Sequence, residues 1–307
     1  MISSLLVISK SYLNFHLAIL LFLMQPFHQM ASAQQKVIPL YQGAAPGSEH
    51  WTWKEGETYN TPMKRRVLYN VTQPALLAFL PEPSVANGSA IIIITGGGGR
   101  VLMIDTEGVS TAQALVKKGI AVFVLKHRLA QSKTDDPWKE MMASLRDTTT
   151  RDTIIRQLAR NDLTTALKYV REHANEYNID KNKVGLIGFS AGAVMSANMI
   201  YNGDDKPDFA AMNYGVYRKL KEWPFIKSKI PLFIAVATDD QLAPVSHSIA
   251  LYNHWITSKN SAELHIYAKG GLALQGSPDH GLNGVPANTW IFRFVDWMDA
   301  MGFMKRR

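Results

Sequence analysis

Residues 184–200 read VGLIGFSAGAVMSANMI, an apolar run that ends in a glycine-serine turn and continues into a helical pattern. The run at 184–187 predicts a buried strand, and the run at 193–200 predicts a helix. Between them, the motif Gly-Phe-Ser-Ala-Gly at 188–192 places Ser190 in the turn. Glycines beside such a serine remove the Cβ atoms that would clash, so its hydroxyl projects above the sheet. The stretch predicts a nucleophile elbow; a glycine-rich turn with a passive serine is the alternative.

Apolar runs of similar length predict the other strands of the sheet. Several are apolar at every residue, which is typical of strands covered on both faces. Helical patterns separate them, and the clearest has apolar side chains at 3.6-residue spacing from Leu163 to Tyr177, closed by Asn178. This alternation predicts the α/β fold class, with a doubly wound, mostly parallel sheet, helices on both faces and a single domain over residues 34–307. The predicted strands are Leu76–Leu80, Ala90–Ile94, Ala121–Leu125, Val184–Ile187, Leu232–Val236 and Leu264–Tyr267.

A second glycine-rich stretch, residues 96–99, follows Thr95 at the end of a predicted strand. It lacks the G-x-G-x-x-G pattern of a dinucleotide site and the Gly-Lys-Ser/Thr ending of a P-loop, so no nucleotide cofactor is expected. Glycine leaves backbone N–H groups open toward a ligand. We therefore expect the N–H groups of Gly97 and Gly98, together with that of Ala191, to form an oxyanion hole.

A nucleophilic serine needs a base and an orienting acid, which in this kind of fold follow it in the order acid, histidine. The predicted strand at 232–236 leads into Asp239 and Asp240, so a carboxylate lies where a strand meets the functional edge of the sheet. We prefer Asp240 as the acid, with Asp239 as the alternate. The structural interpretation of both is a helix N-cap ahead of Val245.

The base is predicted by elimination among nine histidines. His280 lies in the loop between the last predicted strand and the final helix, which begins near Thr289, and this is where the base belongs. The other eight lie elsewhere: His16 and His28 in the N-terminal segment, His50 before the sheet, His127 and His265 at or in strands, and His173, His247 and His254 in helical patterns.

The composition is that of a folded protein. The chain has 307 residues, of which 47% are hydrophobic and 19% charged, enough apolar material for one large core. It has no cysteine, which excludes disulfides, thiol catalysis and zinc–thiolate sites, and no metal is expected. The formal net charge is +8, but the basic clusters at 64–66 and 305–307 belong to no nucleic-acid motif. We interpret the charge as solvated surface charge and expect no nucleic-acid partner.

The first 33 residues predict a signal peptide. Lys10 is the only charged residue among them, an apolar stretch runs from Leu17 to Met24, and residues 31–33 read Ala-Ser-Ala, a small-x-small cleavage pattern. The apolar stretch is too short to span a bilayer. We expect a mature chain that starts near Gln34, is secreted or periplasmic and has no membrane span; an uncleaved anchor is the alternative.

The interval from Gln131 to Arg160 contains no clear strand and predicts an excursion over the site. It fits either a lid that contacts substrate or a surface helix pair. Five side chains are candidates to line the site where the alcohol part of a substrate would bind, and each could equally belong to the core. They are Trp138, Met141 and Met142 in the interval, and Tyr214 and Tyr217 beyond it.

Six motifs follow one another along the chain: Thr95-Gly96-Gly97-Gly98, Asp-Thr-Glu-Gly at 105–108, Phe-Val-Leu-Lys-His-Arg-Leu at 123–129, Gly-Phe-Ser-Ala-Gly at 188–192, Pro-Asp-Phe-Ala-Ala at 207–211 and Asp239-Asp240. With them, the sequence from Pro74 to Met301 resembles the acetyl esterase/lipase group of α/β-hydrolases, particularly exported bacterial carbohydrate esterases of the acetylxylan-esterase kind. The resemblance implies an α/β-hydrolase fold and hydrolysis of a short acyl ester by a serine triad, without metal or cofactor. The implied partner is a small ester or an acetylated saccharide, and no oligomeric state is predicted.

One position departs from the family pattern. The family reads Gly-Gly-His-Gly-Phe after the last strand, whereas residues 270–274 read Gly-Gly-Leu-Ala-Leu, so Leu272 stands where its histidine is expected. We expect His280, eight residues further on, to replace it through a rearranged loop. A catalytically silent carbohydrate-binding or scaffold protein is the alternative if it does not. A peptidase of the same fold is a further alternative.

Overall fold

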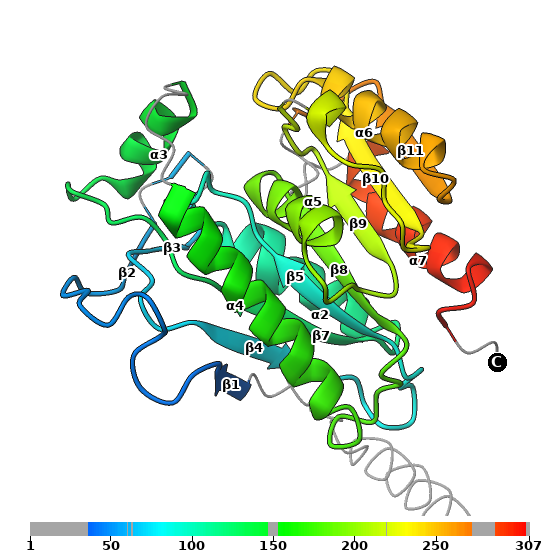
Figure 1. The fold of residues 1–307 in the computed structure, drawn as a ribbon, viewed down its shortest axis with the longest axis horizontal. Helices are drawn as coiled ribbons and strands as arrows, with labels where there is room; N and C mark the ends of the chain where they lie inside the picture. The colour runs from blue at the N-terminus through cyan, green and yellow to red at the C-terminus, as the bar shows by residue number, and fades with distance from the viewer. Residues whose placement is uncertain are drawn as a thin grey trace, which may run out of the picture. The chain divides into compact units, whose positions relative to one another are not determined.

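A central sheet of eight strands organises the fold (Figure 1). The structure is a computed structural model that describes residues 36–59, 61–62, 64–146, 153–218, 220–271 and 286–304. The predicted signal peptide, His280 and Leu272 lie outside these residues. In spatial order the strands are β1 (Lys36–Pro39), β4 (Ala75–Phe79), β7 (Ala121–Lys126), β5 (Ala90–Ile94), β8 (Val184–Phe189), β9 (Ala210–Asn213), β10 (Leu232–Ala237) and β11 (Ala262–Tyr267).

The pairing within this sheet confirms the predicted fold class. The six strands from β7 onward in this spatial order, β5 included, are parallel to one another. β4 pairs antiparallel with β7, and β1 pairs antiparallel with β4. The six predicted strands all lie in it, to within a few residues at their ends. β5, β7, β8, β9 and β10 are buried along nearly their whole length, because helices cover both faces of the sheet.

The four isoleucines of β5 illustrate how the two faces are filled. Ile91 and Ile93 pack on the face covered by α2 and α7, whereas Ile92 and Ile94 pack on the face covered by α4. Each buried isoleucine contributes about 1.5–3 kcal/mol relative to an exposed one. Figure 1 shows α4, α5 and α6 on the near side of the sheet. The helices are α2 (Ser110–Val116), α3 (Pro137–Arg146), α4 (Thr153–Glu172), α5 (Ala191–Asn202), α6 (Val245–Thr257) and α7 (Trp290–Ala300).

A second, three-stranded sheet was not predicted. It consists of β2 (Gly56–Thr58), β3 (Val67–Tyr69) and β6 (Val101–Leu102), all antiparallel. β6 directly follows the glycine loop, and a π-helical turn over Ile104–Val109 follows β6. Short 3-10 segments lie at Leu220–Glu222 and Pro286–Thr289. Strands of two or three residues carry too little alternation to stand out in a sequence.

The interval 131–160 contains α3 and the start of α4. These two helices fit the interpretation of the interval as a helix pair. Met141 of α3 is buried with Val67, Val101 and Met103, and Trp138 and Met142 pack against the same cluster. Arg100, from the glycine loop, donates to Glu140 Oε2 of α3 at 3.4 Å. The helix therefore packs on the small sheet beside the glycine loop.

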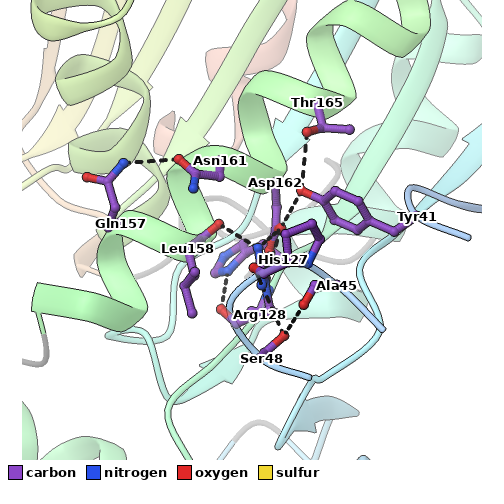
Figure 2. A network of polar contacts seen from close by, with 11 residues as sticks. Tyr41, Ala45, Ser48, His127, Arg128, Gln157, Leu158, Asn161, Asp162 and Thr165 are labelled. Carbon is purple, nitrogen blue, oxygen red and sulfur yellow. Dashed lines mark hydrogen bonds and ion pairs between the residues drawn. The ribbon is translucent and has the colours of Figure 1, made fainter. Parts of the chain in front are cut away.

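A buried ion pair fastens the N-terminal part of the described chain to the main sheet (Figure 2). Arg128 and Asp162 are both fully buried, and Arg128 Nη2 donates to Asp162 Oδ1 at 2.7 Å. Arg128 Nη1 also donates to the Pro46 carbonyl at 2.6 Å and to Ser48 Oγ at 3.0 Å. Tyr41 donates to Asp162 Oδ1 at 3.0 Å. The dense hydrogen bonding satisfies charges whose burial would otherwise be costly.

Among the residues that the structure describes, no helix is both long and apolar enough to cross a bilayer.

Candidate active site

Ser190 occupies the turn between β8 and α5, as predicted. Its backbone has φ 51° and ψ −115°, a conformation that non-glycine residues rarely adopt. A Cβ on Gly188 would lie 2.6 Å from Ala193 Cα, and one on Gly192 would collide with the Ile94 carbonyl, so both positions require glycine. Strain of this kind costs about 1–3 kcal/mol and is found at sites that the surrounding structure holds in place. The N-terminus of α5 directs its positive dipole end at this turn.

The main chain on either side of Ser190 is held by the neighbouring strand. Ser190 N donates to the Asn213 carbonyl at 3.0 Å. The side-chain oxygen of Asn213 accepts from Ala235 N of β10 at 3.2 Å. Asn213 therefore ties the serine turn to β10, the strand that precedes the candidate acid, and no pattern in the sequence indicated this role.

The glycine loop lies directly beside the serine. A Cβ on Gly96 would be 2.9 Å from Ser190 Cβ. Gly97, Gly98 and Gly99 all have positive φ angles, of 123°, 65° and 81°. A Cβ on Gly97 would collide with the Val101 carbonyl. The structure thus brings the predicted oxyanion residues and Ser190 to one edge of the sheet, with a backbone path that only glycine adopts readily.

Glu107 forms a hydrogen bond to the start of the glycine loop. This carboxylate is buried, accepts from Gly96 N through Oε2, and accepts from the Tyr214 hydroxyl through Oε1 at 2.9 Å. Burial raises the pKa of Glu107 to about 7. The motif at 105–108 contains this glutamate, but the sequence indicated no role for it. That motif, Asp-Thr-Glu-Gly, holds two carboxylates, and no local pattern shows which of them is buried.

Asp239 and Asp240 perform different tasks. Asp240 is buried, and its Oδ1 accepts from Leu242 N at 2.8 Å and from Ala243 N at 2.9 Å. Its Oδ2 is also buried but has no hydrogen-bond donor among the described residues. Burial raises the pKa of Asp240. Asp239 Oδ1 instead accepts from the backbone of Gly270 at 2.9 Å and of Gly271 at 2.7 Å.

Neither aspartate caps the following helix. The N-cap residue of α6 is Pro244, and no side chain caps that helix. Asp239 fixes the first residues of the loop that follows β11, whereas Asp240 has one buried carboxylate oxygen that receives no donor from the described part of the chain. The second arrangement is the one that a triad acid requires, because that oxygen must receive the N–H of an imidazole.

The predicted base, His280, lies outside the described residues, so its position relative to Ser190 stays a prediction. Five other histidines are engaged elsewhere through a ring nitrogen. Their partners are the Arg128 carbonyl for His127, the Tyr169 carbonyl for His173, the Tyr217 carbonyl for His247, the Tyr201 hydroxyl for His254 and Glu263 for His265.

The aromatic and methionine candidates for the alcohol side fall mainly in the core. Tyr214 and Tyr217 are only 1% and 2% exposed, and Met141 is buried in the cluster under α3. Leu145 of α3 was not a candidate, yet it lies closer to the predicted oxyanion residues. A Cβ on Gly98 would be 3.3 Å from Leu145 Cδ2, and Leu145 is exposed to solvent. Among the described residues, no group of three or more histidines or carboxylates could hold a metal ion.

The sequence profile of the dienelactone hydrolase family matches residues 76–301. The chain belongs to this family. The dienelactone hydrolase family member is 28% identical over 254 residues to an acetylxylan esterase of Xylanibacter ruminicola, covering 72% of this chain and 45% of that protein. It is 27% identical over 135 residues to endo-1,4-beta-xylanase B of Butyrivibrio fibrisolvens, covering 44% and 18%. The chain thus spans less than half the length of these relatives.

Solved structures confirm the α/β-hydrolase fold. An acetyl ester-xyloside bifunctional hydrolase from Caldicellulosiruptor lactoaceticus superimposes with a TM-score of 0.59 at 20% identity, covering 88% of this family member and 97% of that chain. A propionate-bound esterase from Thermogutta terrifontis also reaches 0.59, at 15% identity, covering 81% and 99%. The predicted resemblance to acetylxylan-type α/β-hydrolases is therefore confirmed.

Proposed function

We propose that the protein is a serine esterase that hydrolyses short-chain acyl esters, acetyl above all, on carbohydrate. The observation that carries this proposal is the buried Oδ2 of Asp240, which has no donor among the described residues. Asp240 follows β10, the strand that pairs with β9, and Asn213 at the end of β9 accepts from Ser190 N. A strained serine, a glycine loop beside it and a half-used buried carboxylate are the parts that acyl transfer needs.

The reaction proceeds in two steps. His280 takes the hydroxyl proton of Ser190 as the serine oxygen bonds to the ester carbonyl carbon, and Asp240 stabilises the imidazolium. The N–H groups of Gly97, Gly98 and Ala191 hold the negative carbonyl oxygen. The imidazolium then gives its proton to the departing alcohol. Water, deprotonated by His280, attacks the acyl-serine and releases the carboxylic acid and Ser190.

Two observations favour an acetyl group on a sugar. The curated relatives are an acetylxylan esterase and a xylanase. Leu145 and Met141 of α3 crowd Gly98, with atoms 3.3 and 3.5 Å from where a Cβ on that glycine would lie. Bulky side chains against the oxyanion loop leave less room for a long acyl chain. A secreted or periplasmic location, proposed from the first 33 residues, suits a polymeric substrate outside the cell.

The Ser190→Ala variant tests the nucleophile. We expect turnover of nitrophenyl acetate to fall at least about a thousandfold, because the acyl-enzyme can no longer form. Far-UV circular dichroism and the melting temperature should match the wild type. A variant that keeps near-wild-type rates would show that another group is the nucleophile.

The substrate class is tested with the wild-type chain. Rates on nitrophenyl esters should fall steeply from acetyl to octanoyl, and acetylated xylo-oligosaccharides should release acetate. A preference for octanoyl, or no acetate from any acetylated sugar, contradicts the proposal.

A catalytically silent carbohydrate-binding protein is the second candidate, favoured by Leu272 where the family has a histidine. A fluorophosphonate probe separates the two. Labelling at Ser190 supports the esterase, and an intact Ser190 that fails to label while a related esterase reacts supports the silent protein.

A further inference from the structure

A cavity at the small sheet has no role in the mechanism above. It has a volume of about 260 Å3 and lies between the small sheet and the end of β7. Its walls include Glu55, Glu57, Leu68, Tyr69, Val71 and Lys126. Sites for drug-sized ligands are typically about 300–1,000 Å3, so the occupant of this cavity is a smaller unit.

The cavity is connected to the proposed oxyanion residues through two steps of backbone. Tyr69 of β3 pairs with Val101 of β6. Val101 N in turn donates to the Gly97 carbonyl at 3.1 Å. Val101 is therefore in backbone contact both with Tyr69 in the cavity wall and with Gly97 in the glycine loop. Lys126 is the last residue of β7, which places the cavity on the same edge of the main sheet as Ser190.

The charges in the cavity are already paired with one another. Lys126 Nζ lies 2.6 Å from Glu55 Oε2, and Glu55 Oε1 accepts from Thr72 N and Gln73 N. Glu57 pairs with Arg66 at 3.4 Å and is half-exposed. An anionic ligand would face two carboxylates, and a cation would find both carboxylates neutralised. The electrostatics therefore favour a neutral ligand with hydroxyl groups, which can donate to Glu57 without displacing a charge.

The remaining walls are apolar. Leu68 and Val71 supply aliphatic surface, and the backbone of Gly56 lies against the Tyr69 ring, so closely that a Cβ there would overlap it. Tyr69 is only partly buried, so the part of its ring that lines the cavity adds apolar surface with few rotatable bonds. A pyranose has the matching character, with a C–H face for the ring and equatorial hydroxyls for the carboxylate.

We propose that this cavity binds a neutral sugar ring of the substrate chain, flanking the sugar that carries the ester. The assignment rests on the proposed carbohydrate esterase function and names where the saccharide extends from Ser190. The glycan then runs from the serine past the glycine loop and onto the small sheet. The subsite acts on affinity for the saccharide and leaves the chemistry of the ester unchanged.

The Glu57→Ala variant tests the subsite, with Glu176→Ala as its matched control. Both glutamates are about half-exposed, at 50% and 48%, and each forms one ion pair, Glu176 with Lys36 at 3.2 Å. Binding of unacetylated xylotetraose to the full-length chain is measured by calorimetry. We expect Glu57→Ala to weaken binding about tenfold, the effect of losing a hydrogen bond to a charged acceptor. Glu176→Ala should bind like the wild type.

Turnover separates this proposal from the proposed function. On nitrophenyl acetate, Glu57→Ala should keep the wild-type kcat/KM, whereas on acetylated xylo-oligosaccharides its KM should rise about tenfold at constant kcat. Unchanged xylotetraose binding in Glu57→Ala, equal losses in both variants, or no binding by the wild type would overturn the subsite. Absence of esterase activity in the wild type would instead overturn the proposed function, and the calorimetry would still decide the subsite.

Discussion

Two buried carboxylates, Glu107 and Asp240, lie at the edge of the sheet that carries Ser190, and they differ in how completely their oxygens are hydrogen-bonded. On the glycine-loop side, both oxygens of Glu107 accept hydrogen bonds, from Gly96 N and from the Tyr214 hydroxyl. On the acid side, Asp240 uses only Oδ1, and its buried Oδ2 meets no donor among the described residues. A fully satisfied buried carboxylate fixes the groups around it, whereas a half-satisfied one is a costly arrangement that a function must justify.

The largest effect should come from Asp240→Asn. The amide cannot hold the imidazole in the productive tautomer or stabilise its charge, so kcat on nitrophenyl acetate should fall about 10³–10⁴-fold with the fold retained. Asp239→Asn is the control, because Asp239 contacts only the start of the loop at Gly270 and Gly271 in the described chain. A larger loss in Asp239→Asn would exchange the roles of the two aspartates.

The pH dependence of stability should isolate Glu107. Its pKa of about 7 in the folded chain exceeds the usual 4.5, so between these values the folded state binds more protons than the unfolded state. The contribution of Glu107 to the free energy of unfolding is therefore full below pH 4.5 and is lost as pH rises to 7. The loss amounts to about 3 kcal/mol.

The Glu107→Gln variant provides the comparison for that measurement. Its amide oxygen can accept from Gly96 N and its amide nitrogen can donate to Tyr214, so both contacts survive without a titrating group. The free energy of unfolding, measured in urea from pH 5 to 8, should fall more steeply in the wild type than in Glu107→Gln. Parallel curves would show that Glu107 keeps an ordinary pKa.

Tyr214→Phe would leave Glu107, like Asp240, with only one hydrogen-bonded carboxylate oxygen among the described residues. It deletes the donor to Glu107 Oε1 and leaves that buried oxygen unsatisfied, at a cost of about 1–3 kcal/mol in unfolding free energy. Tyr217→Phe is the matched control, since its buried hydroxyl has no partner among the described residues. Equal destabilisation by the two variants would mean that the Tyr214 hydrogen bond contributes nothing of its own.

The smallest effect concerns acyl length. Leu145→Ala removes the side chain that crowds Gly98 and should raise the butyrate-to-acetate ratio of kcat/KM about three- to tenfold. Ile256→Ala, at an exposed position on α6, should leave the ratio unchanged. An unchanged ratio in Leu145→Ala would remove α3 from the acyl side of the site.

The parts of the site that were predictable are those encoded locally. The strand, turn and helix around Ser190 are contiguous, and the apolar runs of the main sheet are long enough to read individually. The role of Glu107 was not predicted, because its partner Tyr214 is 107 residues away and no local pattern indicates such a contact. The preference for Asp240 over Asp239 was a choice between adjacent identical residues. In the structure Asp240 accepts from its own turn, at Leu242 N and Ala243 N, whereas Asp239 accepts from Gly270 and Gly271, 31 and 32 residues away, a tertiary contact that no local pattern reports.

The buried Arg128 has a consequence for how the protein withstands proteases. Arg128 Nη1 donates to the Pro46 carbonyl and to Ser48 Oγ, so detachment of residues 41–48 would leave that buried nitrogen without these two acceptors. Proteases cut chain segments that detach transiently, and a segment whose release opens the core detaches rarely. The segment from Tyr41 to Ser48 should therefore resist cleavage, and its removal would destabilise the interior around Arg128.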